Sequence, residues 1–72
     1  MAKLVPVSGT EAVRKLAKDG WEVSRQKGSH VMMVKDDYRW TISVPQHREL
    51  GPGLLRSLIR QAGLSVSEFN EL

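Results

Sequence analysis

Two very short turns constrain the fold more than any other feature of the sequence. Three stretches with strand-like composition start at Trp21, His30 and Tyr38. Turns at residues 28–29 (Gly-Ser) and 36–37 (Asp-Asp) separate them. Such short turns join antiparallel strands, whereas a parallel pair needs a crossover of a dozen or more residues. The sequence therefore predicts a three-stranded antiparallel sheet.

The third of these stretches has the clearest strand pattern. Apolar and polar side chains alternate over residues 38–44, and Pro45 ends the predicted strand because proline lacks a ladder donor. The alternation places Trp40 in the core, and the same argument places Trp21 there. The alternative is that these aromatic side chains stack on nucleic-acid bases. The nearly apolar second stretch, residues 30–34, adds two predicted core residues, Met32 and Met33.

A capping box marks the start of a first helix. Ser8 is followed three residues later by Glu11, so that each side chain can accept a hydrogen bond from the other's backbone N–H. Gly20 stands where a left-handed residue ends a helix. We therefore predict a helix over residues 9–19.

A second helix is predicted between Pro52, which suits a first helical turn, and Gly63. A second capping pattern at residues 65–68 predicts a last helical turn that includes Phe69. The apolar side of the second helix consists of Leu54, Leu55, Leu58, Ile59 and Ala62.

These elements predict an α+β fold in the order α-β-β-β-α, with both helices on one face of the sheet. Double-stranded-RNA-binding domains have this order of elements. A chain of 72 residues is too short for two cores, so residues 1–72 are expected to form a single domain.

Composition excludes several classes of protein. There is no cysteine, which rules out a disulfide scaffold, a thiolate zinc site and a cysteine nucleophile. Two histidines without a nearby carboxylate pair give little support to a metal site, and no glycine motif for a nucleotide cofactor is present. No apolar run nears the roughly 20 residues that span a bilayer, and the N-terminus does not resemble a signal peptide. We therefore expect a cytoplasmic protein without a metal or cofactor and without a membrane partner.

The charge is distributed unevenly. Residues 1–64 hold all eleven Lys and Arg but only six Asp and Glu, and so carry +5, whereas residues 65–72 carry −2. A basic body suits a polyanionic partner, although a solvated surface has the same charge pattern.

His30 is the best candidate for a catalytic residue. It follows the Gly-Ser turn and begins a strand, which would fix its backbone next to solvent. Imidazole exchanges protons near neutral pH, as a general acid or base must. The alternative is a surface histidine without a role.

Several neighbours could bind phosphate. Lys27, Arg25 and Ser29 are close to His30 in sequence, and the loop after Pro45 holds a second histidine. That histidine could contact phosphate or carry a second proton, or it could have no role. On the second helix, two arginines four residues apart form either a phosphate-binding stripe or a solvated helix face. The remaining candidates are His47, Arg48, Arg56 and Arg60.

Three blocks of sequence resemble a known family. The first runs from residues 20–23 (Gly-Trp-Glu-Val) into 25–30 (Arg-Gln-Lys-Gly-Ser-His), the second is 44–47 (Val-Pro-Gln-His), and the third is the second helix with its end, 53–65. In this order and spacing, they resemble the HicA toxin family of bacterial and archaeal toxin–antitoxin systems, over nearly the whole chain. The sequence departs from many members at Val31, where they carry a second histidine, and at Leu54, where they have threonine.

The resemblance implies an mRNA interferase with a double-stranded-RNA-binding-like fold, which cleaves RNA without the ribosome and is held inactive by a HicB-like antitoxin. It implies that His30, the histidine after Gly-Ser, is catalytic. It implies no cofactor. Two other functions stay open. One is a non-catalytic module that binds double-stranded RNA through Arg56, Arg60, Lys15 and Lys18. The other is a protein-interaction domain for an acidic partner.

Overall fold

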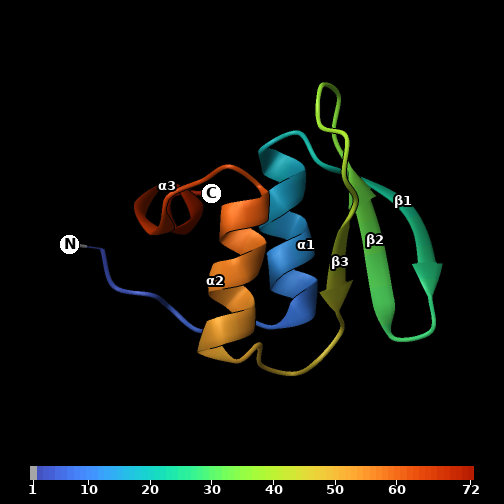
Figure 1. The fold of residues 1–72 in the computed structure, drawn as a ribbon. Helices are drawn as coiled ribbons and strands as arrows, with labels where there is room; N and C mark the ends of the chain where they lie inside the picture. The colour runs from blue at the N-terminus through green and yellow to red at the C-terminus, as the bar shows by residue number, and fades with distance from the viewer. Residues whose placement is uncertain (1) are drawn as a thin grey trace.

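The computed structural model describes residues 2–72 as a three-stranded sheet with helices (Figure 1). Met1, part of the predicted 1–72 domain, lies outside the described residues. The helices are α1 (Gly9–Lys18), α2 (Pro52–Gln61) and α3 (Val66–Asn70). The strands are β1 (Glu22–Lys27), β2 (His30–Val34) and β3 (Ile42–Pro45).

The sheet is antiparallel with strand order β1-β2-β3, and α1 and α2 lie together on one of its faces (Figure 1). None of the helices formed by residues 2–72 lies over the opposite face of the sheet (Figure 1). The predicted α+β class and the α-β-β-β-α order are therefore confirmed, with α3 as a short addition.

Both predicted capping boxes are present. The Ser8 hydroxyl accepts a hydrogen bond from the Glu11 N–H at 3.0 Å, and the Glu11 carboxylate accepts one from the Ser8 N–H at 3.1 Å. Ser65 and Glu68 make the same pair of bonds at the start of α3. These bonds satisfy N–H groups that a helix start leaves without partners, which explains why both helices begin where the sequence predicted.

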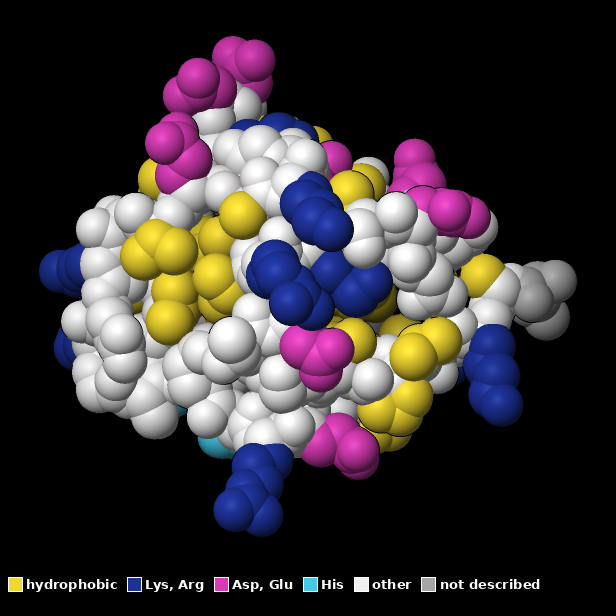
Figure 2. Space-filling model, turned by 180° about the vertical axis from the view of Figure 1, so that it is seen from behind, with side chains coloured by type: hydrophobic (Ala, Val, Ile, Leu, Met, Phe, Trp, Pro, Cys, Tyr) yellow, Lys and Arg dark blue, Asp and Glu magenta, His cyan; other side chains and the backbone are white. Residues whose placement is uncertain are grey.

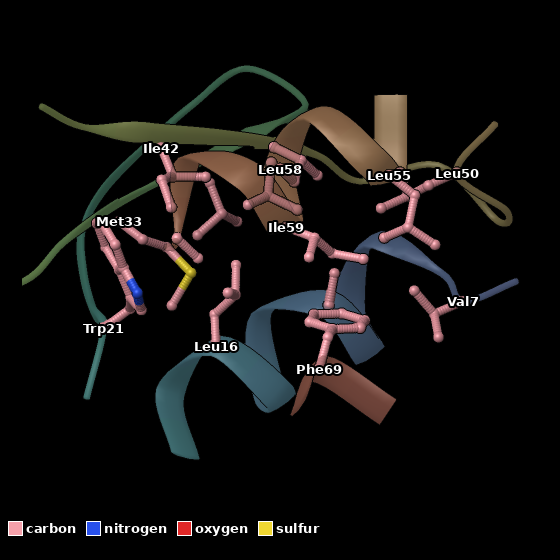
Figure 3. Close-up of a cluster of buried hydrophobic side chains, with 14 residues drawn as sticks. Val7, Leu16, Trp21, Met33, Ile42, Leu50, Leu55, Leu58, Ile59 and Phe69 are labelled. Carbon is pink, nitrogen blue, oxygen red and sulfur yellow. The ribbon is translucent and has the colours of Figure 1, made fainter. Parts of the chain in front are cut away.

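The core lies between the sheet and the helices (Figure 3). Trp21 is 1% exposed, as predicted, and Met33 is fully buried. Phe69 of α3 packs into the same cluster as Leu16 of α1. Leu54, which was predicted on the apolar side of α2, is instead 37% exposed. A single continuous core therefore holds all three helices to the sheet.

The prediction for residues 38–41 was wrong. Strand β3 begins at Ile42, and Trp40 is 49% exposed rather than buried. The Trp40 indole N–H donates to the carbonyl of Gln61 at 2.8 Å, at the end of α2, where helical carbonyls lack partners. The Tyr38 ring lies between the two tryptophan rings, 5.0 Å from Trp21 and 5.1 Å from Trp40. These contacts draw the segment toward α2 and away from the sheet.

Candidate active site

His30 is the first residue of β2 and lies next to both other strands. Its Cα partner on β1 is Lys27, and its Cα partner on β3 is Pro45. The preceding turn contains Gly28 with φ = 59°, a left-handed conformation that glycine adopts without strain. The His30 side chain is exposed, as proton exchange with a bound substrate requires.

The strand register places His30 on the uncovered face of the sheet. Val31 and Met33 are buried against the helices, so the alternating residues His30 and Met32 point to the other side. The prediction that Met32 belongs to the core is therefore wrong: it is partly exposed on this face. We call this uncovered side of the sheet, with Lys27, Arg25, His30 and Met32, the open face.

A β-bulge brings two cations to the open face. The register shifts between Val23 and Arg25, so that Val23 is opposite buried Met33 while Arg25 is opposite Met32. Without the extra residue, the alternation that puts Val23 on the side of Met33 would put Arg25 on that side too. The bulge instead places Arg25 and Lys27 on the side of His30, since directly opposed residues share a face.

The segment after β3 is hydrogen-bonded to the turn at residues 28–29, which precedes His30. The Gln46 N–H donates to the carbonyl of Ser29 at 2.7 Å, which extends the β2–β3 contact one residue beyond the strand. The Gly9 N–H, in the first turn of α1, donates to the carbonyl of His47 at 2.9 Å. The Thr10 hydroxyl donates to the side-chain oxygen of Gln46 at 3.3 Å. Hydrogen bonds therefore tie the loop that carries His47 both to the turn before His30 and to the start of α1.

Gly9 allows this close approach and was missed by the sequence analysis as a site-building residue. A Cβ atom at this position would collide with the Pro45 carbonyl oxygen and fall 2.7 Å from the Cα of Gln46. The residue is buried, and its φ is not in the left-handed region. Position 9 therefore requires glycine because α1 packs closely against the end of β3. The residues around Gly9 in the sequence do not indicate this contact.

Three cations, two on the open face and one in the loop after β3, are free to bind an anion. Arg25, Lys27 and Arg48 are exposed. The ion pairs in residues 2–72 join other groups, Arg14 with Glu11 and Lys35 with Asp19. An anion on the open face would therefore not compete with an existing salt bridge for these side chains.

Glu11 is the acidic group that caps the adjacent helix start. The Ser8 N–H donates to its carboxylate, which lowers the pKa of Glu11 below its ordinary value of 4.5. The Ser65 N–H has the same effect on the pKa of Glu68 at α3. Both carboxylates therefore stay charged and stabilise their helix starts at neutral pH.

Arg56 and Arg60 do not join the His30 site. They line a hollow of about 500 Å³ with residues 63–66, and Arg56 also lines an adjoining hollow of about 600 Å³ with Lys3. No strand residue lines either hollow. This groove between α2, α3 and the N-terminal segment belongs to the helical side of the molecule.

Basic side chains also occur on other faces. Figure 2 shows the face turned away from the view of Figure 1, with Lys and Arg at its centre and around its outline. Lys15 of α1 is partly buried, and its ammonium group donates to the Leu72 carbonyl at 3.1 Å and lies 5.4 Å from the centre of the Phe69 ring. Basic side chains are thus not confined to the open face, and one of them, Lys15, serves the packing of α3.

Two further observations concern metals and membranes. Within residues 2–72, no group of three or more His, Asp or Glu side chains is gathered in a way that could hold a metal ion. None of the described helices has both the length and the apolar character that a membrane crossing needs.

Comparison with known proteins relates the chain to a protein family and to solved structures. A family model described as the HicA toxin of bacterial toxin–antitoxin systems matches residues 9–64. The fold is similar to a chain in a solved toxin–antitoxin complex from Streptococcus pneumoniae, with a TM-score of 0.72 and 37% sequence identity. That match covers 81% of this chain and 98% of the other. The comparison with curated proteins gave no match.

Proposed function

The chain belongs to the HicA toxin family, and from this premise we propose that it is an endoribonuclease that cleaves mRNA without the ribosome, with His30 as a proton-transfer residue. One observation carries the proposal. An exposed imidazole lies on the open face, directly opposite Lys27 and beside a strand end that is fixed by hydrogen bonds.

The chemistry of RNA cleavage fits such a site. The 2′-hydroxyl must lose a proton as it attacks phosphorus, and the leaving oxygen must gain one. A positioned imidazole that moves one of these protons accelerates such a step by about 10²–10⁴-fold. Lys27, with Arg25 or Arg48, stabilises the charge that builds up on the phosphoryl oxygens. Ser29 lies beside His30 in the turn and is a further phosphate contact in this proposal.

The partner in this proposal is a HicB-like antitoxin that covers the open face. In support, the similar structure from Streptococcus pneumoniae is a toxin–antitoxin complex. The +5 charge of residues 1–64 also favours an acidic partner. Hydrogen exchange of the complex is expected to protect the backbone of β2 near His30. A complex in which His30 and Lys27 keep the exposure of the free toxin contradicts this part of the proposal.

A non-catalytic RNA-binding module is the second candidate, because the Arg56–Arg60 groove is remote from the open face. Such a module predicts RNA affinity with a steep salt dependence and no cleavage. Lys15 is less available for RNA, since its ammonium group already contacts the Phe69 carbonyl and ring of α3.

Induction in cells tests the proposed function. The wild type is expected to arrest growth and fragment transcripts, whereas His30→Ala should do neither although it accumulates to the same level. Asp36→Asn is the matched control, because Asp36 is an exposed residue in the turn after β2, at the opposite end of this strand from His30. RNA binding is measured separately with the purified proteins. Transcript cleavage by His30→Ala at the wild-type rate contradicts the proposal.

A further inference from the structure

The backbone places the second histidine close to the first. Pro45 is the Cα partner of His30, and the hydrogen bond from Gln46 to Ser29 continues the same ladder. His47 follows one residue later, two positions beyond the direct partner of His30. Diagonal neighbours of this kind have Cα atoms about 7–8 Å apart, within reach of long or aromatic side chains.

Side-chain alternation, continued from β3 into residues 46–47, assigns His47 to the open face. Gln46 turns its side chain toward α1, where it accepts the hydrogen bond from Thr10. In an extended segment, the residues on either side of Gln46 point the other way. Pro45, the Cα partner of His30, is one of them and has a buried side chain, and the other is His47. His47 is exposed.

The backbone of His47 is fixed before any substrate binds. Its carbonyl accepts the hydrogen bond from Gly9 in the first turn of α1. The contact of Gly9 with Pro45 and Gln46 leaves no space for a side chain between α1 and this loop. Both imidazoles are therefore attached to backbone that is held by hydrogen bonds, as positioned catalytic groups require.

We propose that His30 and His47 form an acid–base pair that cleaves RNA by attack of the 2′-hydroxyl, an inference that rests on the proposed endoribonuclease function. One imidazole, neutral, takes the proton of the 2′-hydroxyl as the bond from the 2′-oxygen to phosphorus forms. The other, protonated, gives its proton to the 5′-oxygen as the bond from phosphorus to that oxygen breaks. The products are a 2′,3′-cyclic phosphate and a 5′-hydroxyl, and no water or other co-reactant is consumed.

Charged groups on every neighbouring element accompany this pair. Arg25 and Lys27 come from β1, Glu11 from the start of α1, and Arg48 and Glu49 from the loop itself. The cations on β1 and in the loop can hold the phosphate between the imidazoles. Glu11 is engaged by Ser8 in its capping box, which keeps this carboxylate on the helix start.

The test uses the full-length protein and a short RNA with one cleaved linkage. Single-turnover rates are measured for the wild type, His30→Gln and His47→Gln, with Asp36→Asn as the control. His47→Gln is expected to lose about 10²–10⁴-fold in rate, with RNA binding and thermal unfolding unchanged. The downstream fragment is expected to carry a 5′-hydroxyl.

A second substrate, with sulfur in place of the 5′-oxygen at the cleaved linkage, separates the two roles. A thiolate leaves without a proton, so a variant that lacks the general acid regains its rate on this substrate. The pair predicts that one of the two histidine variants is rescued and the other is not. The proposal is overturned by a His47→Gln variant as fast as the wild type, by rescue of neither variant, or by a downstream 5′-phosphate. A wild type that leaves all RNA intact removes the proposed function itself.

Discussion

The two faces of the sheet are built from alternating residues of the same strands, yet they have opposite properties. On the covered face, Val31, Met33, Ile42 and Val44 are apolar and at most 8% exposed. On the open face, their neighbours include Lys27 and His30, which are exposed. The side chains of the covered face stabilise the fold by their burial, whereas those of the open face are accessible to a substrate. Stability and function should therefore respond to different substitutions, even at adjacent positions.

Adjacent methionines on opposite faces give the largest expected effect. Met33→Ala should lower the free energy of unfolding by about 2–5 kcal/mol, because it removes a fully buried side chain and leaves a cavity. Met32→Ala, on the open face, is the matched control and should cost much less. Urea unfolding measures both. Equal losses of unfolding free energy for Met33→Ala and Met32→Ala would contradict the proposed difference between the two faces.

Gly9 connects the helical layer to the edge of the open face and gives the next effect. Gly9→Ala should destabilise the protein by about 1–3 kcal/mol through overpacking against Pro45 and Gln46. It should also lower RNA cleavage, because the loop that holds His47 must move.

Gly53→Ala is the control for Gly9→Ala. A Cβ atom at Gly53 meets nothing within 4 Å, and the residue lies in helix α2. Alanine there should stabilise by about 0.4–1 kcal/mol. Thermal unfolding in parallel with the cleavage assay compares the two variants. If Gly9→Ala is as stable as the wild type, the close contact of Gly9 with Pro45 and Gln46 is contradicted.

The Trp40 hydrogen bond should have a smaller effect. Trp40→Phe keeps an aromatic ring but loses the bond to the Gln61 carbonyl, at a cost of about 0.5–1.5 kcal/mol in unfolding free energy. RNA cleavage should stay unchanged, since Trp40 contacts the end of α2 rather than the His30 site. A Trp40→Phe variant that unfolds as expected but cleaves RNA more slowly than the wild type would show that Trp40 takes part in the site.

The pH dependence of stability should come partly from the helix starts. The pKa of Glu11 is lowered in the folded state, so its contribution is present above its unfolded pKa, near 4.5, and is lost as the pH falls through the folded pKa. Glu11→Gln keeps an oxygen that can cap the helix but cannot titrate. Its unfolding free energy should therefore fall less steeply than that of the wild type as the pH drops below about 4.5. Identical acid profiles in urea unfolding contradict this.

Local signals in the sequence were sufficient for the order of elements. The turn after Lys27, the two capping boxes and Pro52 at the start of α2 are each determined by neighbouring residues. The position of Trp40 was not predictable in this way. Trp40 alternates with polar neighbours just as a residue of a half-buried strand does. Its actual position depends on the hydrogen bond to the Gln61 carbonyl at the end of α2, which is far away in sequence.

The candidate site could be predicted in its residue types but not in its geometry. The Gly-Ser-His turn singled out His30. The bulge after Val23, the need for glycine at position 9 and the diagonal relation of His47 to His30 all depend on strand register and on packing of α1 against β3. Such contacts join residues that are far apart in sequence, so no local pattern contains them.

The central claim is that His30 contributes to chemistry and not to folding. The most direct measurement takes one preparation of His30→Ala and records both its single-turnover cleavage of RNA and its urea unfolding, beside the wild type. We predict a loss of about 10²–10⁴-fold in rate and a change of no more than about 0.5 kcal/mol in unfolding free energy. Undiminished cleavage by His30→Ala would contradict the account.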